Sequence, residues 1–110
     1  LVLVEGVFDA IKAGENAVPI LGSTLNEEGK LFQSIVQNDT AVYMALDPDA
    51  EKKACYIIQK MLHYDVEVYK VDISGFEDVG EMTRGQFLER KAAATWVNPD
   101  TLFDMQVANI

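Results

Sequence analysis

Short apolar runs recur along the chain with the lengths expected of β-strands. The runs at 1–4 and 41–46 are almost wholly apolar, which is typical of strands buried on both faces of a sheet. Two further strand-like runs lie at 17–21, which contains a proline, and at 66–72, where apolar and polar residues alternate. We therefore predict four strands.

Helical periodicity fills the segments between these runs. The clearest example is 50–63, where one apolar stripe recurs at helical spacing: Ala54, Ile57, Ile58, Met61 and Leu62. A first helix is predicted over 7–13, where a glycine follows. A second is expected to begin at Asn26, a favourable N-cap that precedes two glutamates. A fourth is expected after Thr83, which has a glutamine three residues later, as in a capping box.

The alternation of strands and helices through short connections predicts a parallel sheet with right-handed crossovers. Pro19 cannot donate a ladder hydrogen bond, so the second strand is placed at one edge of the sheet. The alternation at 66–72 favours a second, half-exposed edge. The expected fold is thus α/β and Rossmann-like, with a four-stranded, mostly parallel sheet in the order 2-1-3-4 flanked by helices. In that order, ligands gather outside the carboxyl ends of strands 1 and 3.

Composition places the chain among globular proteins. Its 110 residues are 49% hydrophobic and 25% charged, enough for one domain with one core. No run approaches the roughly 20 apolar residues of a membrane span. The chain starts inside a strand-like run, with no methionine and no signal-peptide pattern, so we expect a fragment of a longer protein. A single cysteine (Cys55) and a single histidine (His63) exclude a disulfide framework and a Cys/His zinc site.

The charge balance limits the partners of the chain. The net charge is −9, which should repel nucleic acid unless cations intervene or a neighbouring domain supplies positive charge. A solvated acidic surface accounts for most of this excess, but it does not account for carboxylates at strand ends.

Three carboxylates are expected at the switch point between strands 1 and 3. Glu5 ends the first strand, and Asp47 and Asp49 follow the third. Pro48 should hold the backbone extended there, so the two aspartates would point to the same side. Uncompensated, the three charges would repel one another, and a divalent cation bound by hard oxygen ligands resolves this, with Mg²⁺ or Mn²⁺ favoured. Gly6 would let a phosphate approach the loop.

Simpler interpretations of these acids remain open. Asp49 could be only the N-cap of the helix that follows it. Asp78, in "FEDVGEM", fits a helix cap as well as a site residue. Glu81 could complete a capping box with Asp78.

The segments "LVEGVFDAI", "LDPDA" and "EDVGEM", in this order on a four-stranded α/β chain, together resemble the Toprim domain of DNA primases, topoisomerases and several nucleases. The family signature is Glu-Gly after strand 1 and Asp-x-Asp after strand 3. The resemblance covers residues 1–94 and leaves 95–110 as a C-terminal extension that closes the domain or docks on a neighbouring one.

Within this family the details resemble bacterial and phage primases and primase-helicases. Asp9 in "EGVFDAIKAG" and the Gly22-Ser23 pair in "PILGSTLNEE" match primase segments. Asp78 and Glu81 match the Asp-x-x-Glu segment, whereas Gly80 stands where many relatives have a polar residue.

The resemblance implies nucleotidyl transfer that makes RNA primers on single-stranded DNA. Asp47, Asp49 and Asp78 would hold Mg²⁺ or Mn²⁺ near a ribonucleoside triphosphate. Glu5 would act as general base or as a further metal ligand, and Asp9 would orient the cluster through hydrogen bonds.

Substrate contacts are less specific in the sequence. Gly22 and Ser23 could touch substrate or simply form a tight turn. Lys52 and Lys53 begin the third helix beside the predicted site. Both could meet phosphate, although a solvated surface explains them equally well.

The implied partners are nucleoside triphosphates and single-stranded DNA, with a basic neighbouring domain or a helicase to bind the template. The implied location is the cytoplasm of a bacterial or phage-infected cell, without a membrane.

Two other classes of function use similar acids. A Toprim nuclease or topoisomerase would cut phosphodiesters, but a topoisomerase needs a nucleophilic tyrosine, and all four tyrosines lie in or beside expected core elements: Tyr43, Tyr56, Tyr64 and Tyr69. A non-enzymatic receiver domain would need an acidic pair after strand 1 and a Lys-Pro after a fifth strand, and neither is present.

Overall fold

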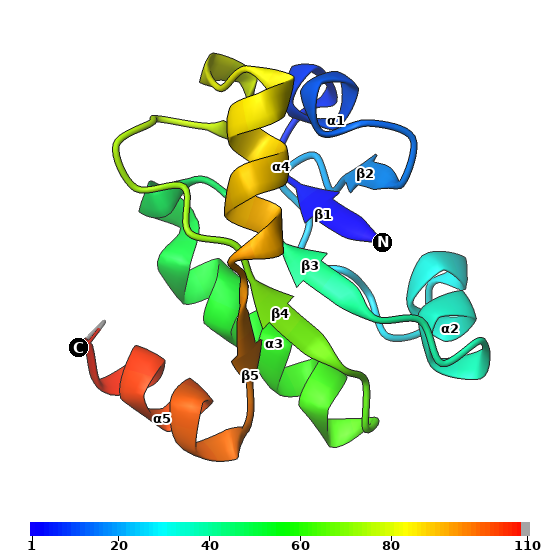
Figure 1. Ribbon diagram of the computed structural model, residues 1–110. Helices are drawn as coiled ribbons and strands as arrows, with labels where there is room; N and C mark the ends of the chain where they lie inside the picture. The colour runs from blue at the N-terminus through cyan, green and yellow to red at the C-terminus, as the bar shows by residue number, and fades with distance from the viewer. Residues whose placement is uncertain (109–110) are drawn as a thin grey trace.

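Five strands form one sheet in the order β2-β1-β3-β4-β5 in the computed structural model, which describes residues 1–108. The first four strands run parallel, and β5 pairs antiparallel with β4 (Figure 1). Each strand has three residues: β1 Val2–Val4, β2 Ala17–Pro19, β3 Val42–Met44, β4 Val68–Lys70 and β5 Thr95–Val97.

Helices cover both faces of the sheet. Within residues 1–108, the five α-helices are α1 Val7–Ala13, α2 Lys30–Gln37, α3 Glu51–His63, α4 Arg84–Ala92 and α5 Pro99–Ala108. Two single-turn 3₁₀ helices, η1 Pro48–Ala50 and η2 Val79–Glu81, lie in the connections that follow β3 and β4. No helix within residues 1–108 is long and apolar enough to span a bilayer.

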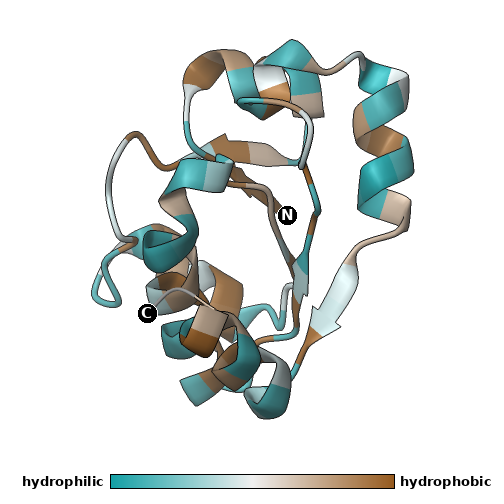
Figure 2. Ribbon diagram, turned by 90° about the vertical axis from the view of Figure 1, so that its left-hand side faces the viewer, coloured by the Kyte–Doolittle hydropathy of each residue, from teal (hydrophilic) through white to brown (hydrophobic). Residues whose placement is uncertain are grey.

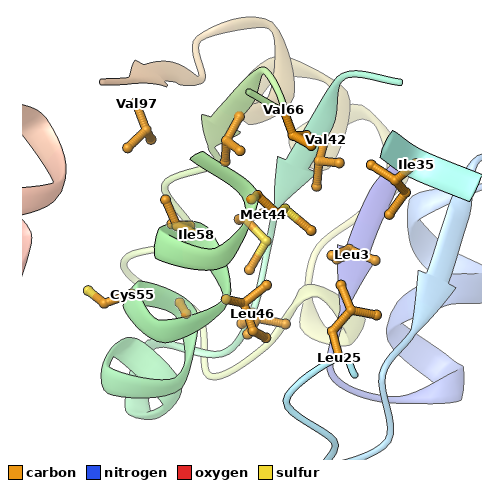
Figure 3. Close-up of a cluster of buried hydrophobic side chains, with 14 of the residues drawn as sticks. Leu3, Leu25, Ile35, Val42, Met44, Leu46, Cys55, Ile58, Val66 and Val97 are labelled. Atoms are coloured by element: carbon orange, nitrogen blue, oxygen red, sulfur yellow. The ribbon is translucent and has the colours of Figure 1, made fainter. Parts of the chain in front are cut away.

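Successive side chains of each strand point to opposite faces of the sheet, and a separate hydrophobic core lies on each face. Leu3 belongs to the core on one face of the sheet, together with residues of α2 and α3 such as Ile35 and Ile58 (Figure 3). Leu102 of α5 is a member of the same core. Val2 and Val4 belong to the core on the other face, with residues of α1, η2 and α4. Polar and apolar segments alternate along the helices (Figure 2), as expected when one side of each helix faces the sheet.

The predicted α/β fold and the strand order 2-1-3-4 are confirmed. β2 lies at the edge of the sheet, with Pro19 paired opposite Val4, so the edge position expected from the missing N–H is correct. The first helix has its predicted bounds. The apolar stripe of the third helix faces the core, with Leu62 half-buried and the other four residues buried.

The second predicted edge is wrong. β4 is an interior strand because β5 pairs along its outer side, with Val97 opposite Val68 and Trp96 opposite Tyr69. Tyr69 and Lys70, which point to opposite faces of the sheet, are both only partly buried, whereas Val68 is fully buried, so an interior strand keeps polar and half-exposed side chains here. Alternation reports the exposure of a strand face, and it carries no information about the next strand.

The predicted start of the second helix is also wrong. Asn26 opens a turn rather than a helix: its Oδ1 accepts a hydrogen bond from the Glu28 N–H at 2.9 Å, and its carbonyl accepts one from Gly29 at 2.9 Å. The helix begins at Lys30 with Gly29 as N-cap. Asparagine stabilises such turns as readily as it caps helices, so the residue type alone did not decide between them.

Residues 95–108 continue the same sheet and core. Val97 of β5 and Leu102 of α5 are buried with the α3 side of the sheet. The division of the chain at residue 94 stays a prediction, and residues 109–110 of the predicted extension lie outside the described residues.

Candidate functional site

Glu5 lies directly after β1 and is held from two sides. Its backbone carbonyl accepts a hydrogen bond from the Leu21 N–H at 2.9 Å, which ties the loop after β2 to the end of β1. Its Oε1 accepts a hydrogen bond from the Lys53 ammonium at 2.6 Å. Its other carboxylate oxygen, Oε2, is buried and has no hydrogen-bond partner within residues 1–108. A buried carboxylate oxygen without a partner is costly unless a ligand satisfies it.

Asp47 follows β3 and has the same property. Its Oδ1 is buried and finds no hydrogen-bond partner in the described part of the chain. Burial, followed by the charges of four other carboxylates, raises the pKa of Asp47 to about 6. Those carboxylates, in order of decreasing effect, belong to Asp9, Asp78, Glu5 and Asp49. The charges of these acids therefore act on Asp47 at the carboxyl ends of β1 and β3.

The predicted extended conformation after Asp47 is wrong. Pro48–Ala50 forms a 3₁₀ turn, with the Ala50 N–H donating to the Asp47 carbonyl at 2.9 Å. Proline is well suited to the first position of a helical turn, so it begins one here instead of extending the chain. Asp49 is exposed, and the N-cap of α3 is Ala50. Asp49 is thus not the N-cap of α3, and its charge has the smallest effect on the pKa of Asp47.

Asp9 is a buried connector between two loops. Its Oδ2 accepts a hydrogen bond from the Gly6 N–H at 3.0 Å, and its Oδ1 accepts one from the Gly80 N–H at 2.8 Å. A Cβ atom at position 80 would lie 3.1 Å from both Asp9 Oδ1 and Asp78 Oδ1. The close approach of the two carboxylates to this backbone accounts for a glycine at a position where the family resemblance of the sequence led us to expect a polar residue.

Asp78 and Glu81 have structural roles in the η2 turn. Asp78 is the N-cap of η2, and its Oδ1 accepts a hydrogen bond from the Glu81 N–H at 3.0 Å. Glu81 is exposed, and its carboxylate accepts a hydrogen bond from the Glu77 N–H at 3.4 Å. The charge of Asp78 also raises the pKa of Asp47, so Asp78 caps a turn close to the acidic cluster.

The loop after β2 forms a tight turn beside Glu5. Gly22 has a φ of +84°, a conformation that favours glycine. Ser23 Oγ accepts a hydrogen bond from the Leu25 N–H at 3.3 Å, and its own N–H donates to Ile20 at 3.0 Å. These contacts agree with the turn interpretation of the Gly-Ser pair, and a contact with substrate stays a prediction.

Lys53, rather than Lys52, contacts the cluster. Lys52 is exposed, whereas the ammonium of Lys53 pairs with Glu5 and its side chain is only 19% exposed. The sequence places two adjacent lysines in the first turn of α3. It does not decide which of them faces the strands, because that depends on where the helix starts.

The donor set suits a hard divalent cation only in part. Within residues 1–108, no group of three or more His, Cys, Asp or Glu side chains is arranged to hold a metal ion. The predicted convergence of three carboxylates at ligand distance is therefore not formed. The two unpartnered buried oxygens, Glu5 Oε2 and Asp47 Oδ1, nevertheless have the chemistry that Mg²⁺ and Mn²⁺ prefer.

Three of the four tyrosines have contacts outside the acidic cluster, and the ring of the fourth, Tyr56, lies under the Lys60 ammonium. Tyr43 and Tyr69 stack with ring centroids 4.9 Å apart, and the Tyr69 hydroxyl donates to Glu67. The Tyr64 hydroxyl donates to Glu27 at 3.1 Å, which raises the pKa of Tyr64. These contacts are structural.

A hollow of about 730 Å³ lies between α2 and α3, with Phe32, Lys60 and Tyr64 in its lining. None of the acids that surround Asp47 lines this hollow. The candidate site therefore lies at the carboxyl ends of β1 and β3 and not in this hollow.

No protein-family model matches the chain, and no curated protein matches it in sequence. Among solved structures, the chain is similar to the crystal structure of the Aquifex aeolicus primase with its zinc-binding and RNA polymerase domains. The TM-score is 0.68 at 24% sequence identity, and the match covers 87% of this chain and 26% of that one. The chain thus shares its fold with a part of that protein and spans about a quarter of its length.

Proposed function

We propose that the chain is a Toprim-type catalytic domain of a DNA primase, which joins ribonucleotides into primers on single-stranded DNA during replication. The observation that carries this proposal is the pair of buried, unpartnered carboxylate oxygens of Glu5 and Asp47 after neighbouring parallel strands. The fold shared with part of a bacterial primase supports it, as does the order of the Glu-Gly and Asp-x-Asp motifs.

Glu5 and Asp47 would hold Mg²⁺ or Mn²⁺, with Asp78 and Asp49 nearby. Bound there, the cation would neutralise charge that develops on the transferred phosphoryl group.

Glu5, Lys53 and Asp9 would each have a different role in this reaction. Because Lys53 occupies Oε1 of Glu5, Oε2 is the oxygen left to accept the proton of the attacking hydroxyl or to bind the cation. Asp9 holds the Gly6 and Gly80 backbone in place around the cluster. Gly22, Ser23 and Lys52 lie on exposed surface and are secondary candidates for substrate contact, and Glu81 supports the η2 turn.

The proposed substrates are nucleoside triphosphates and single-stranded DNA. A chain with a net charge of −9 needs basic surface from elsewhere to bind a template, and we propose that a neighbouring domain or a helicase supplies it. The reaction would take place in the cytoplasm of a bacterial or phage-infected cell.

The first test is metal binding by the wild-type chain and by Asp47→Asn. We expect Mn²⁺ or Mg²⁺ at a hundredfold excess over its Kd to raise the Tm of the wild type by on the order of 10 °C. The variant should lose most of this shift. Asp39→Asn is the matched control, because Asp39 is an exposed acid before β3 whose φ of +52° suits asparagine.

The second test incubates the chain with ribonucleoside triphosphates and a single-stranded template. Short RNA products that disappear in Asp47→Asn would support the proposal. Cleavage of the template without synthesis would replace it by the nuclease alternative. An unchanged wild-type Tm at every metal concentration would refute metal-dependent chemistry of either kind.

A further inference from the structure

We propose that Lys53 binds a phosphoryl oxygen of the substrate and that Glu5 holds its ammonium in place for this purpose. The inference rests on the proposed function, because it assigns a substrate-binding residue to the same site. The ligand chemistry is that of a phosphate ester, which a nucleoside triphosphate or the backbone of single-stranded DNA can supply.

The position of Lys53 is well defined. Its Nζ lies 2.6 Å from Glu5 Oε1, and the exposed fractions of the two side chains are 19% for Lys53 and 25% for Glu5. Such partial burial makes the ion pair less screened than one on open surface. The ammonium is therefore held at the mouth of the acidic cluster and not distributed over many rotamers.

The ammonium of Lys53 also has spare donors. An ammonium group carries three N–H bonds, and the Glu5 carboxylate is the one acceptor that the described residues give it. Two donors therefore remain for a ligand while the pair with Glu5 is intact. Phosphoryl oxygens are suitable acceptors for a lysine that acts as a point charge.

Electrostatics makes a cation necessary at this place. The acidic cluster consists of Asp47 and the four carboxylates whose charges raise its pKa. A triphosphate or a DNA strand that approaches this cluster is repelled. Among the lysines and arginines within residues 1–108, Lys53 alone forms an ion pair with a member of this cluster, namely Glu5. It also lies in the first turn of α3, where the helix dipole favours anions.

A phosphate-binding role and a purely structural ion pair predict different results for Lys53→Met. If Lys53 only held Glu5 in place, its loss would weaken metal binding and phosphate binding together. If it binds phosphate, phosphate binding weakens while metal binding is unchanged or tighter, because a repelling positive charge has been removed from beside the carboxylates.

The experiment is calorimetric titration of the 110-residue chain with three probes: Mn²⁺ alone, ATP in the presence of Mg²⁺, and a single-stranded DNA oligonucleotide. For Lys53→Met we expect the Kd of ATP or of the oligonucleotide to rise about tenfold or more, with no weakening of Mn²⁺ binding. The probe that is affected identifies the source of the phosphate. Lys53→Arg should retain most of the phosphate binding, and Lys30→Met, which removes an exposed charge at the start of α2, is the control.

Two outcomes would overturn the inference. Unchanged binding of both phosphate probes would leave Lys53 as a counter-ion of Glu5 alone, and parallel weakening of all three probes would make it a structural residue. The Tm of each variant identifies unfolding, and if Lys53→Met does not fold, Lys53→Gln replaces it with the same criteria. A wild-type chain that binds ATP through Lys53 but no Mn²⁺ would instead contradict the proposed function and leave this inference standing.

Discussion

Asp9 accepts a hydrogen bond at 2.8 Å from the backbone N–H of Gly80, which lies 71 residues further along the chain. Its second carboxylate oxygen accepts one from Gly6, the residue after Glu5. One buried carboxylate thus joins the turn that follows β1 to the η2 turn that Asp78 caps, and both turns border the cluster around Asp47.

Replacement of this connector should be costly. Asp9→Ala leaves two backbone N–H groups without their charged acceptor, and we expect a loss of about 3 kcal/mol in the free energy of unfolding. Asp9→Asn should cost less, because its amide oxygen still accepts one of the two bonds. Urea denaturation of both variants measures this, and equal stability of Asp9→Ala and the wild type would show that the two hydrogen bonds contribute nothing.

Two glycine substitutions should have opposite effects. In Gly80→Ala the new methyl group would lie 3.1 Å from two carboxylate oxygens, and because Asp9 is buried and fixed by two hydrogen bonds, we expect a cost of about 2 kcal/mol. Faster hydrogen exchange of the amide at position 80 should accompany it. Gly85→Ala in α4 is the control, because its methyl group meets only Thr83 Oγ1 at 4.0 Å. It should stabilise the chain by about 0.5 kcal/mol.

The stability of the metal-free chain should depend on Asp47 between about pH 4 and pH 6. Its pKa is raised from 3.8 to about 6 in the folded state, so the folded chain binds this proton more tightly than the unfolded chain. The contribution of Asp47 to stability is therefore favourable below pH 4 and is lost as the pH rises through 6.

Asp47→Asn isolates this dependence. The variant should be more stable than the metal-free wild type at pH 8, and this advantage should vanish near pH 4. Asp72, whose pKa is lowered by hydrogen bonds from Ser74, titrates in both proteins and cancels in the difference. Denaturation curves at several pH values give the measurement, and a difference that is constant across this range would contradict the assignment.

The C-terminal segment should contribute to the stability of the whole domain. Leu102 of α5 is 7% exposed within the core on the α3 side, whereas its neighbour Phe103 is 64% exposed. We expect Leu102→Ala to cost about 2–3 kcal/mol and Phe103→Ala to stay within about 0.5 kcal/mol of the wild type. Equal effects of the two substitutions in one cooperative unfolding transition would indicate that α5 is not part of the core.

Local sequence patterns determined the parallel part of the sheet. Apolar runs, a helical stripe at 50–63 and short connections suffice for the order 2-1-3-4, because right-handed crossovers leave few alternatives. The missing N–H of Pro19 placed β2 at the edge. This order places Glu5 and Asp47 at the same end of the sheet, because the carboxyl ends of neighbouring parallel strands lie side by side.

Tertiary structure alone decided the rest. Three contacts join segments that no local pattern relates. They are the pairing of β5 with β4, the hydrogen bond from Gly80 to Asp9, and the contact of Lys53, rather than Lys52, with Glu5. Proline suits both an extended chain and the first residue of a helical turn, so the sequence did not decide between them. The structure has the 3₁₀ turn, in which Asp49 is exposed. Periodicity specifies which face of an element is buried, but the distances between side chains are set only when the elements pack together.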